Sequence, residues 1–129
     1  MPRVLAVPLL VLLGAAACTG SSTFDQPKAS AFHAGSCHDL AAPVLQLGRS
    51  LHGLGRKTPS SNQAAAIKDA QMRVRTLMPQ VPAELMPTVQ KLVTTVGILR
   101  IRTDSDSYDP ALADDALAAY RQLVGACTS

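Results

Sequence analysis

Residues 40–54 read LAAPVLQLGRSLHGL, and this stretch decides the fold. Its large apolar residues recur at spacings of 4, 3, 4 and 3, which places them on one face of an α-helix: Leu40, Val44, Leu47, Leu51 and Leu54. Ser36 and Asp39 resemble a capping box at its start, with Asp in place of the usual Glu. Pro43 lies within the first two turns, where proline kinks a helix or delays its start. A helix with one apolar face is stable in water only when other helices cover that face with apolar faces of their own.

Three further segments supply those partners. The second helix follows a cap at Ser60 or Ser61, stops at Pro79, and carries the stripe Ala64, Ile67, Ala70 or Gln71, Val74 and Leu77. The third begins around Pro82 and repeats the 4, 3, 4, 3 spacing in Leu85, Val89, Leu92, Val96 and Leu99. Val93 and Ile98 widen this third stripe, so we expect the third helix to be the most buried.

The fourth helix starts at Asp109-Pro110, an N-cap followed by a proline in the first turn. One face carries Ala113, Leu117, Tyr120, Val124 and Cys127. Because the connections are short, neighbouring helices should run antiparallel. The sequence therefore predicts an all-α, up-down-up-down four-helix bundle, in which the start of helix one and the end of helix four lie at the same end. Cys37 and Cys127 occupy those two positions.

The beginning of the chain has the three parts of a secretory signal. Arg3 follows the amino terminus, residues 4–13 are uncharged and apolar apart from Pro8, and residues 14–17 are small. The stretch Leu9 to Cys18, LLVLLGAAAC, resembles the lipobox of bacterial lipoproteins, although Ala15 stands where Leu or Val is usual. The resemblance implies cleavage before Cys18, a lipid on its sulfur, and residence on the extracytoplasmic face of the cell membrane.

Two other interpretations of this segment compete with the lipobox. A membrane span needs about 20 apolar residues, and the polar residues 19–23 begin too early for one. Ordinary secretion would leave Cys18 unmodified. The cysteine count favours lipidation: of three cysteines, Cys18 takes the lipid, which leaves Cys37 and Cys127 to form a disulfide outside the cytoplasm.

The predicted organisation has three parts. Residues 1–17 form the signal peptide, residues 18–35 a flexible tether after the lipidated cysteine, and residues 36–129 the helical bundle domain. The tether prediction rests on loop-tolerant composition without an apolar period. The alternative is an ordered arm packed on the domain, with Phe24 or Phe32 as its anchor.

Composition excludes some classes of partner. Loss of Arg3 with the leader leaves 11 basic against 9 acidic residues, a balance too near neutral to indicate nucleic acid binding. Two Phe, two Tyr and no Trp provide few stacking surfaces for bases or sugars.

Candidate chemical motifs are weak. Residues 53–58, GLGRKT, fail as a phosphate loop because Arg56 stands where glycine is required and a helix, not a strand, precedes them. The spacing of Asp104, Asp106, Asp109 and Asp115 superficially resembles a calcium loop, but Asp109 replaces its glycine, so a solvated loop and helix cap are the simpler interpretation.

The metal-ligating residues are scattered along the helices. The histidines are His33, His38 and His52, and the last two would stand about 21 Å apart along a straight helix. Met72, Met78 and Met86 lie near the turn between helices two and three, where a soft-metal or haem site is conceivable but core packing is the commoner role of methionine.

The sequence predicts no catalytic residues, no metal site and no cofactor. We expect a non-catalytic binding or interaction module, held to the membrane by its lipid, with an unknown protein partner. The alternative is a carrier of a small apolar ligand, such as haem or a lipid, in a cavity of the bundle core between helices two and three.

Overall fold

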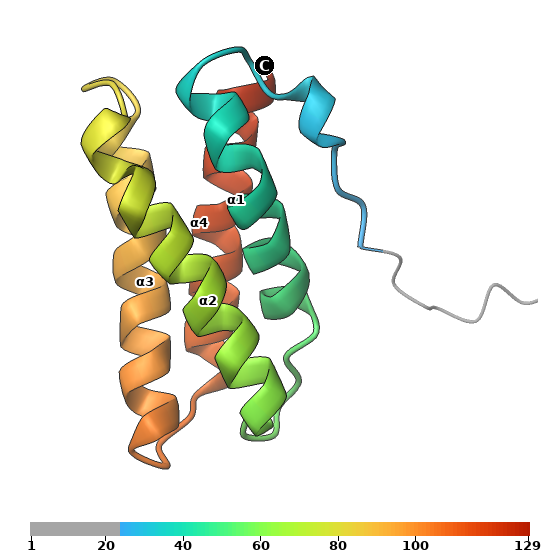
Figure 1. The fold of residues 1–129 in the computed structure, drawn as a ribbon. Helices are drawn as coiled ribbons and strands as arrows, with labels where there is room; N and C mark the ends of the chain where they lie inside the picture. The colour runs from blue at the N-terminus through green and yellow to red at the C-terminus, as the bar shows by residue number, and fades with distance from the viewer. Residues whose placement is uncertain (1–23) are drawn as a thin grey trace, which may run out of the picture.

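The computed structural model describes residues 24–129, which form four long helices and two short 3-10 turns (Figure 1). The elements are η1 (Ala29–Ala31), α1 (Ser36–His52), α2 (Ser61–Leu77), η2 (Met78–Gln80), α3 (Met86–Asp104) and α4 (Pro110–Thr128). This part of the chain contains no strand. The all-α prediction is confirmed.

The four helices form a closed ring. Each packs on its neighbours along the chain, and α1 also packs on α4. In Figure 1, α1 and α3 run in one direction and α2 and α4 in the other, so the predicted up-down-up-down topology is confirmed. Cys37 and Cys127 are joined by a disulfide, with their Cα atoms 5.4 Å apart. The topology thus brings together two residues that are 90 positions apart in the chain.

The core lies between the helices and is almost entirely aliphatic. Its fully buried side chains come from all four helices: Leu40, Val44, Leu47, Val74, Val89, Leu92, Val96, Leu99, Leu123 and Cys127. The predicted stripes therefore face inward. The expectation that the third helix would be the most buried is wrong: Ile98 is 44% exposed and Ile101 is 69% exposed, because both lie on the solvent side of α3. More residues are buried in α1 than in α3.

Two helix starts follow the predicted caps. Ser60 and Gln63 form a reciprocal capping box at α2, in which each side chain accepts a hydrogen bond from the other residue's backbone N–H. The Asp109 carboxylate accepts from the Ala111 N–H at the start of α4. Both caps satisfy backbone donors that have no partner inside the helix.

The other two starts differ from prediction. The N-cap of α1 is Gly35, at a φ of 90° that favours glycine, and the Ser36 hydroxyl instead donates to the Gln80 carbonyl. The third helix begins at Met86 instead of around Pro82. Pro87 fits the first turn of α3, because backbone N–H groups in that turn have no intrahelical carbonyl partner and proline therefore loses no hydrogen bond. Pro43 lies inside α1 without ending it.

The prediction of a flexible tether is corrected for residues 24–35. These residues form an ordered arm along α1 and α4. Phe32 is buried in the core cluster, and the Phe24 ring stacks on the His52 ring with centroids 4.4 Å apart. The His33 N–H donates to the Cys127 carbonyl. Composition missed the arm because these anchors are isolated and follow no helical period. Residues 18–23 of the predicted tether lie outside the described residues.

Candidate binding surfaces

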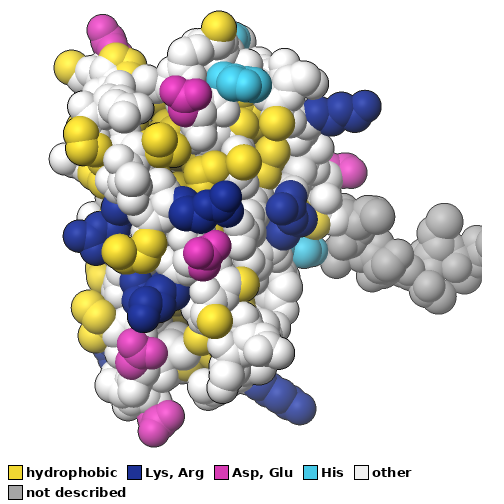
Figure 2. Space-filling view, viewed as in Figure 1, with side chains coloured by type: hydrophobic (Ala, Val, Ile, Leu, Met, Phe, Trp, Pro, Cys, Tyr) yellow, Lys and Arg dark blue, Asp and Glu magenta, His cyan; other side chains and the backbone are white. Residues whose placement is uncertain are grey.

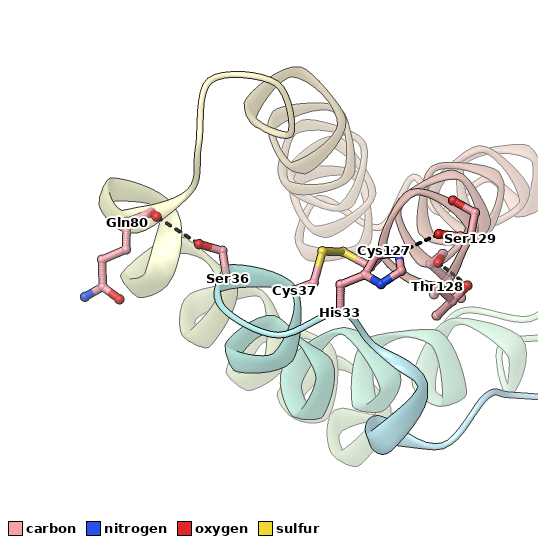
Figure 3. The surroundings of a disulfide bond; sticks show 8 residues. His33, Ser36, Cys37, Gln80, Cys127, Thr128 and Ser129 are labelled. Carbon is pink, nitrogen blue, oxygen red and sulfur yellow. Dashed lines mark hydrogen bonds between the residues drawn. A yellow bond between two sulfur atoms is a disulfide. The ribbon is translucent and has the colours of Figure 1, made fainter.

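The disulfide closes one end of the bundle, and the arm reinforces it (Figure 3). The His33 ring lies 2.6 Å from the Ser129 carbonyl, measured from Nε2. Ser36 Oγ donates to the Gln80 carbonyl over 3.0 Å, which joins the start of α1 to η2. The predicted pairing of Cys37 with Cys127 is therefore part of a larger set of ties at this end. Cys18, the predicted lipidation site, lies outside the described residues.

The seam between α1 and α4 is closely packed and covered by the arm. A Cβ added at Gly48 would lie 2.4 Å from the Tyr120 ring, so only glycine lets the two helices approach this closely. Gln26 Nε2 donates to both the Leu45 carbonyl and Tyr120 Oη, at 2.8 and 2.9 Å. Burial raises the pKa of Tyr120, although Gln26 and nearby arginines oppose that effect. The arm thus satisfies the polar end of a buried aromatic residue.

The seam between α2 and α3 is built differently, around a polar bridge. Gln71 is 3% exposed and is the only polar residue buried within residues 24–129. Its Nε2 donates to the Val93 carbonyl over 2.9 Å, and its Oε1 accepts from Arg100. A Cβ added at Gly97 would stand 3.4 Å from Gln71 Nε2, an ordinary van der Waals distance, so the bridge does not depend on glycine at this position. A buried amide with both ends satisfied is tolerated in a core.

Below this bridge, α2 and α3 diverge (Figure 1). The side chains of this region leave a groove of about 140 Å³ between the two helices. Its walls are partly apolar and partly charged: Pro59, Ala64, Ala65, Ile67, Lys68, Leu99, Arg100, Thr103 and Asp104. The groove opens to solvent on the side of the bundle opposite the arm. It is too small for a drug-sized ligand, which usually occupies 300 to 1,000 Å³ or so, but it has room for a single side chain.

The surface around the groove combines apolar and basic side chains. On α2, Lys68, Met72 and Arg75 follow one another at spacings of four and three, so they form one stripe beside the groove. On α3, Ile101 stands one turn from Asp104, which lines the groove. We use the name α2–α3 face for Lys68, Met72, Arg75, Arg100 and Ile101. Figure 2 shows Lys and Arg side chains interspersed with hydrophobic ones over these two helices.

The basic groups of the α2–α3 face have no acidic partner within 4 Å among residues 24–129. Within residues 24–129 one ion pair is present, between Arg73 and Asp69 on the neighbouring side of α2, 3.9 Å apart. Arg100 bonds to the neutral amide of Gln71. Met72 is 45% exposed, so the same surface also leaves apolar area in water. No sequence-based expectation covered this face, although its α2 residues follow the i, i+4, i+7 spacing of a helical stripe.

A second concavity lies at the end of the bundle remote from the disulfide. It measures about 450 Å³ and is lined by Leu51, His52, Leu54, Gly55, Arg56, Tyr108, Asp109, Pro110, Ala113, Asp114 and Leu117. Several of its polar groups already have structural partners. The His52 ring stacks on Phe24, Tyr108 Oη donates to the Gly55 carbonyl over 2.7 Å, and Asp109 caps α4. Burial, with the nearby carboxylates of Asp114 and Asp109, raises the pKa of Tyr108.

The other residues singled out by sequence do not converge. His33 lies at the disulfide end and His52 at the opposite end of α1. Met78 and Met86 pack against the core, whereas Met72 is exposed. Residues 53–58 belong to the connection between α1 and α2, and Asp109 is a helix cap. Nowhere in residues 24–129 do three His, Cys, Asp or Glu side chains gather closely enough to hold a metal ion.

Comparison of the chain with protein-family models, with curated proteins and with solved structures gives no match. Among the helices of residues 24–129, none combines the length and the hydropathy needed to cross a membrane.

Proposed function

We propose that this chain is a lipid-anchored, non-catalytic interaction module on the extracytoplasmic face of a bacterial cell membrane. The lipobox-like stretch ending at Cys18 supports the anchor. The observation that carries the interaction role is the α2–α3 face, where exposed apolar side chains and unpaired basic groups surround a groove on the side opposite the arm. Apolar side chains rimmed by polar and charged ones are one feature of surfaces that bind another macromolecule.

The ordered arm determines how the proposed anchor would hold the domain. With Phe24 fixed on α1 and α4, six residue steps separate it from Cys18. Those steps span at most about 21 Å even when fully extended. The domain would therefore stay close to the bilayer, not at the end of a long tether.

The same geometry orients the domain. Two helices side by side measure about 20 Å across, so the path from Phe24 around the bundle to the opposite seam exceeds about 30 Å. A lipid on Cys18 would hold the α1–α4 side toward the membrane. The α2–α3 face would then point away from the bilayer, where a partner protein can reach it.

The carrier alternative has less support from the geometry. Haem or a lipid would need a largely enclosed site of several hundred Å³ or so. The groove between α2 and α3 holds about 140 Å³, and the larger concavity lies at the end of the bundle instead of between α2 and α3. We therefore do not propose a carrier.

The anchor is tested by metabolic labelling of the full chain in bacterial cells with an alkyne fatty acid. We expect Cys18→Ala to abolish labelling and to release the protein from the membrane fraction. The double variant Cys37→Ser, Cys127→Ser is the control for labelling alone: it removes the other two cysteines and should remain labelled, although it also loses the disulfide. Labelling that survives Cys18→Ala would refute the lipid assignment.

A further inference from the structure

We propose that the α2–α3 groove binds an acidic segment of a partner protein, with one apolar side chain of that segment inserted between α2 and α3. The inference rests on the proposed interaction role and adds the chemistry of the partner. It follows from the size of the groove, the charge around it and the direction in which it faces.

The size of the groove favours a peptide anchor. Its floor and walls include Ala64, Ile67 and Leu99, which offer small and aliphatic surfaces to an incoming side chain. A volume of about 140 Å³ accommodates one aliphatic or aromatic residue and little more. Single residues that fill a pocket of this kind commonly dominate the binding energy of protein interfaces.

The charge around the groove favours an acidic segment. Lys68 and Arg100 line it, and Arg75 continues the α2 stripe one turn beyond Met72. Asp104 is the one acidic residue in the lining of this groove, so the surface carries a net positive charge. Carboxylates flanking the apolar anchor would meet these three cations at the rim, where complementary charge speeds association and selects the partner.

Two other occupants must be distinguished from an acidic segment of a partner protein. An anionic membrane also attracts basic and apolar groups, but a lipid on Cys18 would hold this face away from the bilayer. A second copy of the chain would have to insert its own acidic residues, which gather near the start of α4 as Asp104, Asp106, Asp109, Asp114 and Asp115. Both occupants are outcomes of the experiment below.

The test uses the chain from Thr19 to Ser129, which retains every helix, the core and the disulfide of the described structure. The probe is a short synthetic peptide of Glu and Asp with one central Leu. Binding is followed by amide chemical shifts in NMR. We expect shifts at the backbone amides of Lys68, Gly97 and Arg100, and loss of binding at high salt. A peptide with Ser in place of Leu, or Lys in place of the acids, should bind at least tenfold more weakly.

Charge reversal locates the site. Lys68→Glu with Arg75→Glu should weaken the acidic peptide about tenfold or more. The matched control, Lys28→Glu with Arg121→Glu, changes the net charge equally on exposed residues elsewhere and should change affinity less than twofold. Both variants keep the core intact, which circular dichroism and the disulfide check. Equal loss in the two variants would mean that only net charge matters and would overturn the proposal.

Three further results would overturn the proposal of an acidic partner segment. The first is that the peptide shifts only amides of the end concavity around Tyr108. The second is self-association of the chain that Lys68→Glu with Arg75→Glu abolishes, and the third is stronger binding to vesicles of phosphatidylglycerol than to the peptide. Labelling of Cys18 is measured separately. If the lipid is present but the acidic peptide does not bind, the anchor stands and the partner chemistry is wrong.

Discussion

The seam between α1 and α4 and the seam between α2 and α3 lie on opposite sides of one bundle and are built by different means. The first is held by the Cys37–Cys127 disulfide, by direct contact of Gly48 with Tyr120, and by the arm that covers it. The second is held by the Gln71 bridge and then opens into a groove. One seam is closed to solvent, and the other leaves apolar and basic groups exposed.

This difference separates stability from interaction within a small domain. Aliphatic residues of modest size and little aromatic mass make up the core, so a covalent tie contributes much of the stability. With one side of the ring tied, the opposite seam can keep a groove and uncompensated charge. The predictions below test this division, beginning with the largest expected effect.

Removal of the disulfide should cause the largest loss of stability. The bond closes a loop of 90 residues, and the chain-entropy model assigns such a loop roughly 4 to 5 kcal/mol. Cys37→Ser with Cys127→Ser should lower the free energy of unfolding by about that amount in urea titrations. Adding a thiol reductant to the unaltered chain should give a similar loss, which controls for the serines. A loss below about 1 kcal/mol in both experiments would contradict the dependence on this tie.

Glycine to alanine substitutions should have opposite effects in the two seams. Gly48→Ala places a methyl group against the Tyr120 ring, so we expect it to destabilise by about 1 to 3 kcal/mol. Gly97→Ala meets only Gln71 Nε2 at 3.4 Å, and the gain in helix propensity should leave the protein unchanged or stabilised by up to about 1 kcal/mol.

Gly125→Ala is the control for these two variants, because its added Cβ would have no atom within 4 Å apart from its chain neighbours and the adjacent backbone of α4. It should stabilise α4 by about 0.5 to 1 kcal/mol. Thermal unfolding of all three proteins checks the order. A Gly97→Ala variant as unstable as Gly48→Ala would mean that the two seams are equally tight.

The Gln71 side chain should contribute to the free energy of unfolding more by filling space than by its hydrogen bonds. Gln71→Ala leaves a void at a buried position and should cost about 1 to 2 kcal/mol. Gln71→Leu fills most of the same space, and the half-buried Arg100 can turn to solvent, so its cost should be below about 1 kcal/mol. Urea unfolding of both variants separates the two contributions. Equal losses for Leu and Ala would show that the hydrogen bonds dominate.

Alkaline pH should weaken the closed seam through Tyr120. Burial raises its pKa in the folded state, so the folded protein holds this proton to higher pH than the unfolded chain. The free energy of unfolding should be constant up to about pH 10, then fall as pH rises through the folded pKa. Tyr120→Phe should reduce that fall more than Tyr108→Phe, because Tyr120 is the more buried. If the free energy of unfolding fell equally steeply with pH in the two variants, the fall could not be assigned mainly to Tyr120.

The sequence was sufficient where a repeating pattern and chain topology acted together. The stripe from Leu40 to Leu54 and its three counterparts predicted four helices, because burial of an apolar face requires a period near 3.6 residues. Short connections then predicted antiparallel neighbours. Together, the helix pattern and the short connections predicted that Cys37 and Cys127 lie at the same end of the bundle. Ser60 and Asp109 were predictable as caps because each accepts a hydrogen bond from a backbone N–H only two or three residues further along the chain.

Only the tertiary structure decided features that depend on single contacts between distant residues. Phe24, Gln26 and Phe32 hold the arm by contacts to α1, α4 and the core. Their spacing in the sequence follows no helical period, so the sequence does not predict these contacts. Ile98, by contrast, is 44% exposed because it stands two residues from Val96, on the side of α3 away from the stripe, so the helical period alone accounts for its position. The groove likewise exists because α2 and α3 diverge, which is a property of helix packing and not of either helix alone.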